Sequence, residues 1–179
     1  IHNYIDSLEP GNTAAKAALD IALYDLHGKI NKIPCHQIFG ANPLLMPATS
    51  MTIGIDSISI IKQKVLEAEE FKMLKIKLGH DNDKQIIESI REITDTPICV
   101  DVNQGWKDKS YALDMAHSLA DKNVHFIEQP LPKNNLEETA WLTANSPLPI
   151  IADEAVQRFS DISLIKDAYS GINIKLMKC

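Results

Sequence analysis

Charged side chains stand at the ends of several apolar, strand-like stretches of this chain. A strand buried on both faces reads as a near-continuous apolar run, and a charge in such a run is costly unless it is paired or bound to a metal. The stretches are KIKL, ICVDVN, HFIEQP, PIIADE and INIKL, which carry Lys75 and Lys77, Asp101, Glu128, Asp153 and Lys175. Three carboxylates and three ammonium groups placed in this way predict one polar site shared by neighbouring strands.

The alternation of side chains along each strand indicates which charges point the same way. Successive residues of a strand face opposite sides of the sheet. Lys75 and Lys77 therefore share one face of their strand, and Asn173 and Lys175 share one face of another. The pattern predicts that the charged faces all turn toward the same space.

The spacing of the charged positions predicts a barrel. From Lys77 to Lys175 they recur every 22 to 27 residues, about the length of one strand, one helix and two loops. Apolar residues at three-to-four spacing predict the intervening helices at 57–71, 84–93, 111–122, 136–144 and 161–169, and a first strand is expected within 48–55. Strict alternation of strands and helices favours an α/β fold, the (β/α)8 TIM-type barrel, whose catalytic groups lie at the carboxyl ends of the strands.

The length of the chain limits how much of a barrel it can form. A complete barrel needs about 250 residues, whereas this chain has 179 and does not begin with Met. We therefore expect a partial barrel of about six βα units, strands one to six, within 48–179 of a longer protein. Residues 1–47, with a helix at 13–30, are interpreted as a lead-in to a missing N-terminal capping domain.

Composition excludes several classes of function. The net charge of −6 argues against nucleic-acid binding, and no apolar run approaches the roughly 18 residues of a membrane span. The three cysteines are odd in number and form no C-x-x-C motif. These features favour reduced thiols and a cytoplasmic enzyme with no membrane contact.

The clustered charges suggest metal-assisted proton transfer. Asp101, Glu128 and Asp153 would repel one another at one site, and a divalent cation bound by all-oxygen ligands, Mg²⁺ or Mn²⁺, would resolve this. Asn103, two residues after Asp101 on the same face, could hydrogen-bond to a metal ligand. A lysine beside the metal could remove the α-proton of a carboxylate substrate, and the cation would stabilise the resulting enediolate.

The strand motifs resemble those of the enolase superfamily, which pairs a lysine or histidine base with Mg²⁺. KIKL, VDVNQGW, FIEQPL, IIADE and INIKLMKC are similar to the muconate-lactonizing subgroup over residues 48–179, and DVNQGW with NIKLMKC most resembles its dipeptide epimerases. The resemblance implies that Lys77 and Lys175 are acid/base residues facing each other across the substrate. It also implies that Lys75 contacts the substrate carboxylate or tunes Lys77, that Thr52 contacts the substrate, and that Asp101, Glu128 and Asp153 bind the metal.

The function implied by this resemblance is that of a Mg²⁺-dependent isomerase. It would epimerise the α-carbon of a dipeptide by two-lysine 1,1-proton transfer through an enediolate, and would act as a homo-oligomer on this small carboxylate substrate. Three reactions of the same site stay open: cycloisomerisation of a muconate-like acid, N-acylamino acid racemisation and o-succinylbenzoate synthesis. A non-catalytic scaffold is the alternative from another class. In the dipeptide epimerases an aspartate pair on the eighth strand holds the substrate amine, and that strand lies outside this chain.

Two further residues are ambiguous in the sequence. Glu154 alternates away from Asp153, which favours a structural role. Trp106 could line the pocket or pack within a loop.

Overall fold

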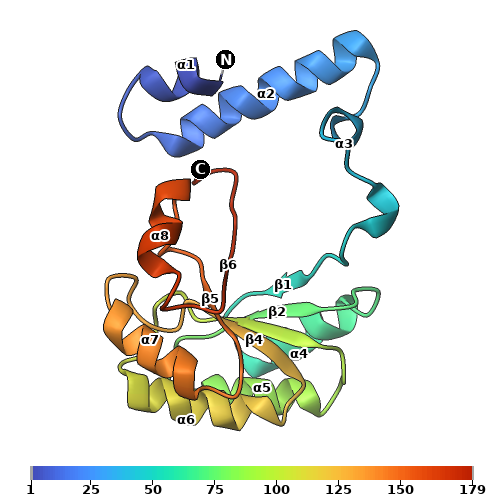
Figure 1. The fold of residues 1–179 in the computed structure, drawn as a ribbon. Helices are drawn as coiled ribbons and strands as arrows, with labels where there is room; N and C mark the ends of the chain where they lie inside the picture. The colour runs from blue at the N-terminus through green and yellow to red at the C-terminus, as the bar shows by residue number, and fades with distance from the viewer. Residues whose placement is uncertain (1, 179) are drawn as a thin grey trace. The chain divides into compact units, whose positions relative to one another are not determined.

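The computed structural model describes residues 2–178, which form two compact units (Figure 1). One unit comprises residues 2–47 with 174–178, and the other is Ala48–Asn173. The first unit contains helices α1 (His2–Ser7), α2 (Thr13–Asn31) and α3 (Cys35–Ile38) and the 3₁₀ turn η1 (Pro43–Leu45). Among residues 2–178, no helix is both long enough and apolar enough to cross a lipid bilayer.

The second unit is a six-stranded parallel sheet with the strands in sequence order. The strands are β1 (Met51–Ile53), β2 (Leu74–Lys77), β3 (Ile98–Asp101), β4 (Val124–Glu128), β5 (Ile150–Ala152) and β6 (Gly171–Ile172). The connecting helices are α4 (Ile58–Glu67), α5 (Asp83–Arg91), α6 (Lys109–Ala120), α7 (Leu136–Asn145) and, after the 3₁₀ turn η2 (Phe159–Asp161), α8 (Ile162–Ile165). The prediction of a partial barrel with six strands alternating with helices is confirmed.

The last βα unit differs from the expectation. The predicted strand INIKL is reduced to Gly171–Ile172, and the helix expected at 161–169 is a 3₁₀ turn followed by the single turn α8. Within the described part of the chain, β6 pairs only with β5. A strand with one neighbour has half the hydrogen bonds of a central strand, which is consistent with its early end.

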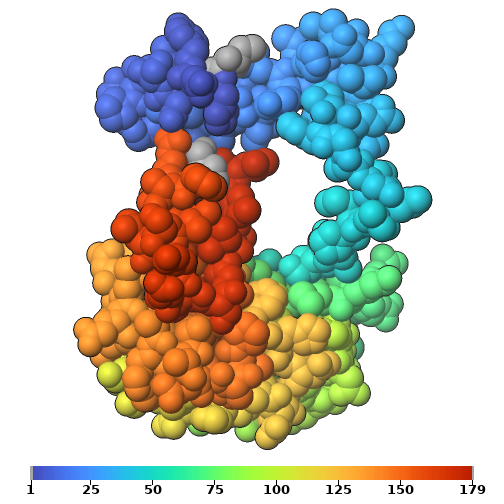
Figure 2. Space-filling model, viewed as in Figure 1, coloured from blue at the N-terminus to red at the C-terminus, as the bar shows by residue number. Residues whose placement is uncertain are grey.

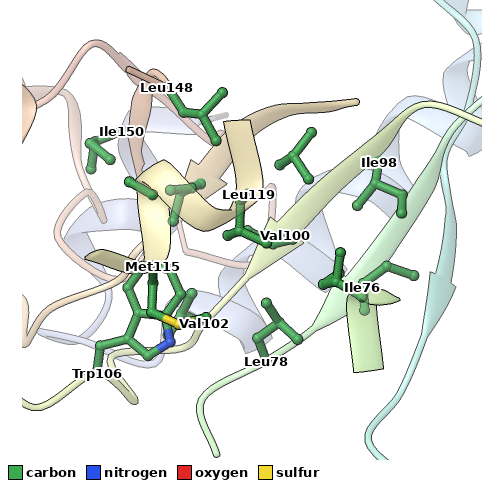
Figure 3. Packing of buried hydrophobic residues seen from close by; sticks show 14 of the residues in the cluster. Ile76, Leu78, Ile98, Val100, Val102, Trp106, Met115, Leu119, Leu148 and Ile150 are labelled. Atoms are coloured by element: carbon green, nitrogen blue, oxygen red, sulfur yellow. The ribbon is translucent and has the colours of Figure 1, made fainter. Parts of the chain in front are cut away.

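The hydrophobic core lies between the sheet and the helices on its outer face. Figure 3 shows Leu119 of α6 against Val100 of β3, and Met115 beside Trp106; all four side chains are at most 2% exposed. Each fully buried side chain of this size stabilises the fold by about 1.5–3 kcal/mol. In the space-filling view, the yellow to orange segments that carry α6 and α7 pack into a continuous surface (Figure 2).

The loops that follow β2 and β3 touch each other through their backbones. Gly79 has a φ of +118°, a conformation that favours glycine. A Cβ atom on Gly105 would lie 2.6 Å from the Cα of Gly79. Only glycines permit this approach, which brings the ends of the two strands together.

Candidate metal centre and lysine pair

The register of the sheet brings four charged residues to neighbouring strand ends. Lys77 of β2 lies opposite Asp101 of β3, and Asp101 lies opposite Glu128 of β4. Lys75 lies two residues before Lys77 on the same face of β2, opposite Cys99. The strand alternation inferred from the sequence is confirmed at these positions.

Three buried carboxylates form a group that could hold a metal ion. Asp101, Glu128 and Asp153 each offer one oxygen, and these oxygens lie within 4.8 Å of one another. The three residues are 0%, 3% and 0% exposed. A buried all-oxygen donor set with this much negative charge fits a hard divalent cation such as Mg²⁺.

Lys75 bridges two of the carboxylates. Its Nζ lies 2.8 Å from Oε2 of Glu128 and 2.9 Å from Oδ2 of Asp101. Burial disfavours the ammonium, but the hydrogen bonds to Glu128 and Asp101 outweigh it and raise the pKa of Lys75. Lys75 is therefore a fixed positive charge inside the site, suited to binding an anionic group.

Lys77 contacts both Asp101 and Asn103. Its Nζ donates to Oδ2 of Asp101 and to Oδ1 of Asn103, at 2.7 Å in each case. Burial opposes ionisation of Asp101, but its hydrogen bonds from Lys77 and Lys75 prevail, so the pKa of Asp101 is lowered. Asp101 is thus an anion over the neutral pH range, as a metal ligand must be.

Asn103 links the lysine to a further acid. Its Nδ2 donates to Oε1 of Glu154 at 3.0 Å, and its backbone N–H donates to Oδ1 of Asp101 at 3.2 Å. The side chain of Asn103 therefore contacts Lys77, whereas only its backbone N–H contacts the candidate metal ligand Asp101. Glu154 joins this network although strand alternation points it away from Asp153, because the strand has already ended at Ala152.

Asn173 is a site residue that the sequence analysis did not select. Its Nδ2 donates to Oε1 of Glu128 at 2.7 Å, and its backbone N–H donates to the carbonyl of Ala152. Lys75 and Asn173 thus hold the two oxygens of the Glu128 carboxylate. A cavity of about 260 Å³ adjoins this contact, lined by Lys75, Cys99, Glu128 and Asn173 among others. The sequence could have indicated Asn173, because strand alternation places it on the same face as Lys175.

The remaining sequence-based candidates lie in different places. Thr52 of β1 pairs with Lys75, on the face that bears the site, and is exposed. Lys175 lies beyond the end of β6 and belongs to the unit of residues 2–47 and 174–178, so its proposed place opposite Lys77 stays a prediction. Trp106 is buried, and its Nε1 donates to Asp83 at 2.9 Å, which supports loop packing.

The sequence matches two models of one protein family. Residues 61–179 match the enolase C-terminal domain-like model, and residues 3–40 match the N-terminal domain of mandelate racemase / muconate lactonizing enzyme. The chain belongs to the mandelate racemase/muconate lactonizing enzyme family of the enolase superfamily. The resemblance inferred from the strand motifs is confirmed at this level.

Several relatives of known activity are similar over the whole chain. The L-Ala-D/L-Glu epimerase of Bacteroides thetaiotaomicron is 55% identical over 180 residues, which are 100% of this chain and 47% of that protein. The Enterococcus faecalis dipeptide epimerase, solved with Mg and L-Leu-L-Tyr, has a TM-score of 0.86 and 34% identity over 99% of this chain and 52% of its own. The N-succinyl Arg/Lys racemase of Bacillus cereus has a TM-score of 0.88 and 31% identity over 99% and 50%. The chain spans about half the length of the curated relatives it matches.

Proposed function

We propose that the protein is a Mg²⁺-dependent epimerase that acts on the α-carbon of a dipeptide. The observation that carries this proposal is the 2.7 Å contact between Nζ of Lys77 and Oδ2 of Asp101. It places a candidate acid/base directly beside a candidate metal ligand. The 55% identity to an L-Ala-D/L-Glu epimerase supports the choice of substrate class.

In the proposed reaction, the three carboxylates bind the cation and Lys75 binds the substrate. Asp101, Glu128 and Asp153 would hold the cation, and the charged Lys75 with Thr52 would bind the substrate carboxylate. When bound, Mg²⁺ supplies a Lewis acid that stabilises the negative charge developing on that carboxylate as the α-proton leaves. The buried surroundings strengthen each of these charge interactions.

Lys77 would exchange the α-proton on one side of the substrate and Lys175 on the other. A proton removed by one lysine and returned by the second inverts the α-carbon through an enediolate. Because each step is reversible, each lysine acts as base toward one epimer and as acid toward the other. The role of Lys175 rests on the family resemblance and on its position three residues after β6.

Racemisation of an N-acylated amino acid is the second candidate. The TM-score of 0.88 to an N-succinyl Arg/Lys racemase favours it. Both substrates present an α-proton between a carboxylate and an acylated nitrogen, so the same metal and lysines serve either one. They differ in the acyl part, which carries an ammonium in a dipeptide and a carboxylate in a succinyl group.

The proposal is tested by incubating the intact protein with L-Ala-L-Glu or N-succinyl-L-lysine in deuterated water. We expect Mg²⁺-dependent deuterium incorporation and inversion with the dipeptide, and little of either with the succinyl compound. The reverse order would favour the racemase. Full activity in EDTA after removal of divalent ions would contradict both.

We also propose that the protein works in the cytoplasm as a homo-oligomer. The free thiols of Cys35 and Cys99 support a reducing compartment. The assembly is inferred from the family resemblance, and light scattering of the intact protein tests it.

A further inference from the structure

Gln129 is a fully buried polar residue that directly follows a candidate metal ligand. It is 0% exposed, and its φ of +41° lies in the left-handed region, which is uncommon for residues other than glycine. This backbone conformation ends the alternation of β4 and turns the side chain toward the neighbouring strand. Such a conformation is retained where surrounding interactions determine it.

The side chain of Gln129 connects β4 to the end of β5. Its Oε1 accepts hydrogen bonds from the backbone N–H groups of Asp153 and Ala155, at 2.9 and 3.1 Å. Asp153 lies one residue beyond β5, where the strand ladder has ended. The Gln129 amide therefore holds the backbone of one candidate metal ligand, while its own backbone is covalently joined to another, Glu128.

The other end of the same amide is also held. Its Nε2 donates to the carbonyl of Leu131 at 3.0 Å and to Oη of Tyr169 at 2.8 Å. Tyr169 lies two residues before β6, so the amide links three consecutive strand units. All four contacts together use both donors and both acceptor positions of the side chain.

The polarity of these contacts requires an amide. Two N–H donors face Oε1, and a carbonyl faces Nε2. A glutamate would place a carboxylate oxygen against the Leu131 carbonyl, and a methionine would leave the Asp153 and Ala155 N–H groups without this acceptor. The methionine leaves buried donors without an acceptor and the glutamate sets two acceptors against each other. Both are costly in a buried site, so either change should shift the loop that carries Asp153.

We propose that Gln129 is a positioning residue that sets the separation of the Glu128 and Asp153 carboxylates and thereby the affinity of the site for a divalent cation. The inference rests on the proposed function, because it assumes that these carboxylates bind the ion. In this role Gln129 itself would touch neither the substrate nor the metal.

The test measures Mn²⁺ binding to the intact protein by electron paramagnetic resonance of the free ion. Gln129→Met and Gln129→Glu should each weaken Mn²⁺ binding by about 10- to 100-fold, as loss of residues that orient metal ligands typically does. Tyr169→Phe keeps the contacts to Asp153 and Ala155, so it should weaken Mn²⁺ binding measurably but less than either Gln129 variant.

Arg91→Met is the control, a half-buried polar residue of the same unit whose side chain also binds backbone groups. The Arg91 guanidinium binds the carbonyls of Thr94, Thr96 and Lys122, which precede β3 and β4 at the opposite end of the sheet. This variant should lower the melting temperature but leave the Mn²⁺ dissociation constant within about twofold, since it touches no residue that orients the metal ligands.

The outcomes separate the inference from the proposed function. If the unmodified protein binds Mn²⁺ and those of the three Gln129 and Tyr169 variants that fold bind it equally well, the inference is overturned and the metal site stands. If Arg91→Met weakens binding as much as the Gln129 variants, the effect is one of general stability and the inference is again overturned. If the unmodified protein binds no Mn²⁺, the proposed function and the inference fail together.

Discussion

The ammonium group of Lys77 donates to Oδ1 of Asn103 across 2.7 Å, from the end of β2 to the residues just after β3. The other end of the Asn103 amide donates to Glu154 at 3.0 Å. A lysine offers only donors and a carboxylate only acceptors, so the orientation of the amide is determined by its two partners. Asn103 thus fixes the position of the candidate acid/base.

Asn103→Ala should slow α-proton exchange while changing KM little. Lys77 would lose one of its two oxygen partners and become less well aligned with the α-carbon, and such misplacement can lower the rate by about 10- to 100-fold. Steady-state kinetics of the intact protein would measure this. Asn82→Ala is the control, because Asn82 is an exposed residue at the start of α5 with no side-chain capping bond. Equal rates for the two variants would contradict the role of Asn103.

Asp101→Asn should abolish divalent-ion binding and Mg²⁺-dependent activity but preserve the fold. The substitution removes the charge that faces both Lys75 and Lys77 at one of the three candidate ligands. Mn²⁺ titration and circular dichroism would measure the two effects. Asp108→Ala removes the N-cap of α6 and should cost about 1 kcal/mol of stability without affecting the metal. Normal Mn²⁺ affinity in Asp101→Asn would show that the ion binds elsewhere.

Asp83→Ala should destabilise the barrel unit by about 3 kcal/mol, because it leaves buried N–H donors without an acceptor. The Asp83 carboxylate is 1% exposed and accepts from the backbones of Gly79 and His80 and from Nε1 of Trp106. Urea denaturation would give the change in the free energy of unfolding. Lys107→Ala removes an exposed ion pair of 3.5 Å with Asp81 and should have no measurable effect. A similarly small effect for Asp83→Ala would show that the Asp83 carboxylate does not stabilise the loops after β2 and β3.

Cys99 should resist alkylation in the folded protein, whereas the exposed Cys35 should react. Burial raises the pKa of the Cys99 thiol from 9.0 to about 11. A folded pKa above the unfolded value means that the associated stability is present below about pH 9 and is lost as the pH rises toward 11. Iodoacetamide labelling at pH 8, with peptide mapping, should modify Cys99 only after urea is added. Rapid labelling of Cys99 in the native state would refute this.

The sequence predicted the elements of the site that follow strand periodicity. Lys75, Lys77, Asp101 and Glu128 lie within strands, where alternation by two determines the face of the sheet. Regular spacing along the chain likewise predicted six strands with helices between them. These features depend on local geometry that repeats, so a single sequence reveals them.

The features that escaped prediction begin where strands end. Gln129 was not selected, because its left-handed backbone conformation ends the alternation of β4. Asn103 was selected as a site residue, but its side-chain contacts to Lys77 and Glu154 were not predicted, since Asn103 is also left-handed and Glu154 lies beyond β5. The hydrogen-bond partners of Asn173 depend on tertiary contacts that no local pattern encodes. The length of β6 was overestimated because its residues have strand-like alternation but only one neighbouring strand among the described residues.

The proposed function requires two lysines to exchange the α-proton from opposite sides of a dipeptide. The most direct measurement is deuterium incorporation from solvent by Lys77→Ala and Lys175→Ala in the intact protein, with each epimer of the substrate supplied separately. Each variant should lose exchange with one epimer and retain slow exchange with the other, in opposite senses. If one variant loses exchange with both epimers and the other loses none, a one-base reaction such as cycloisomerisation or dehydration is the correct account.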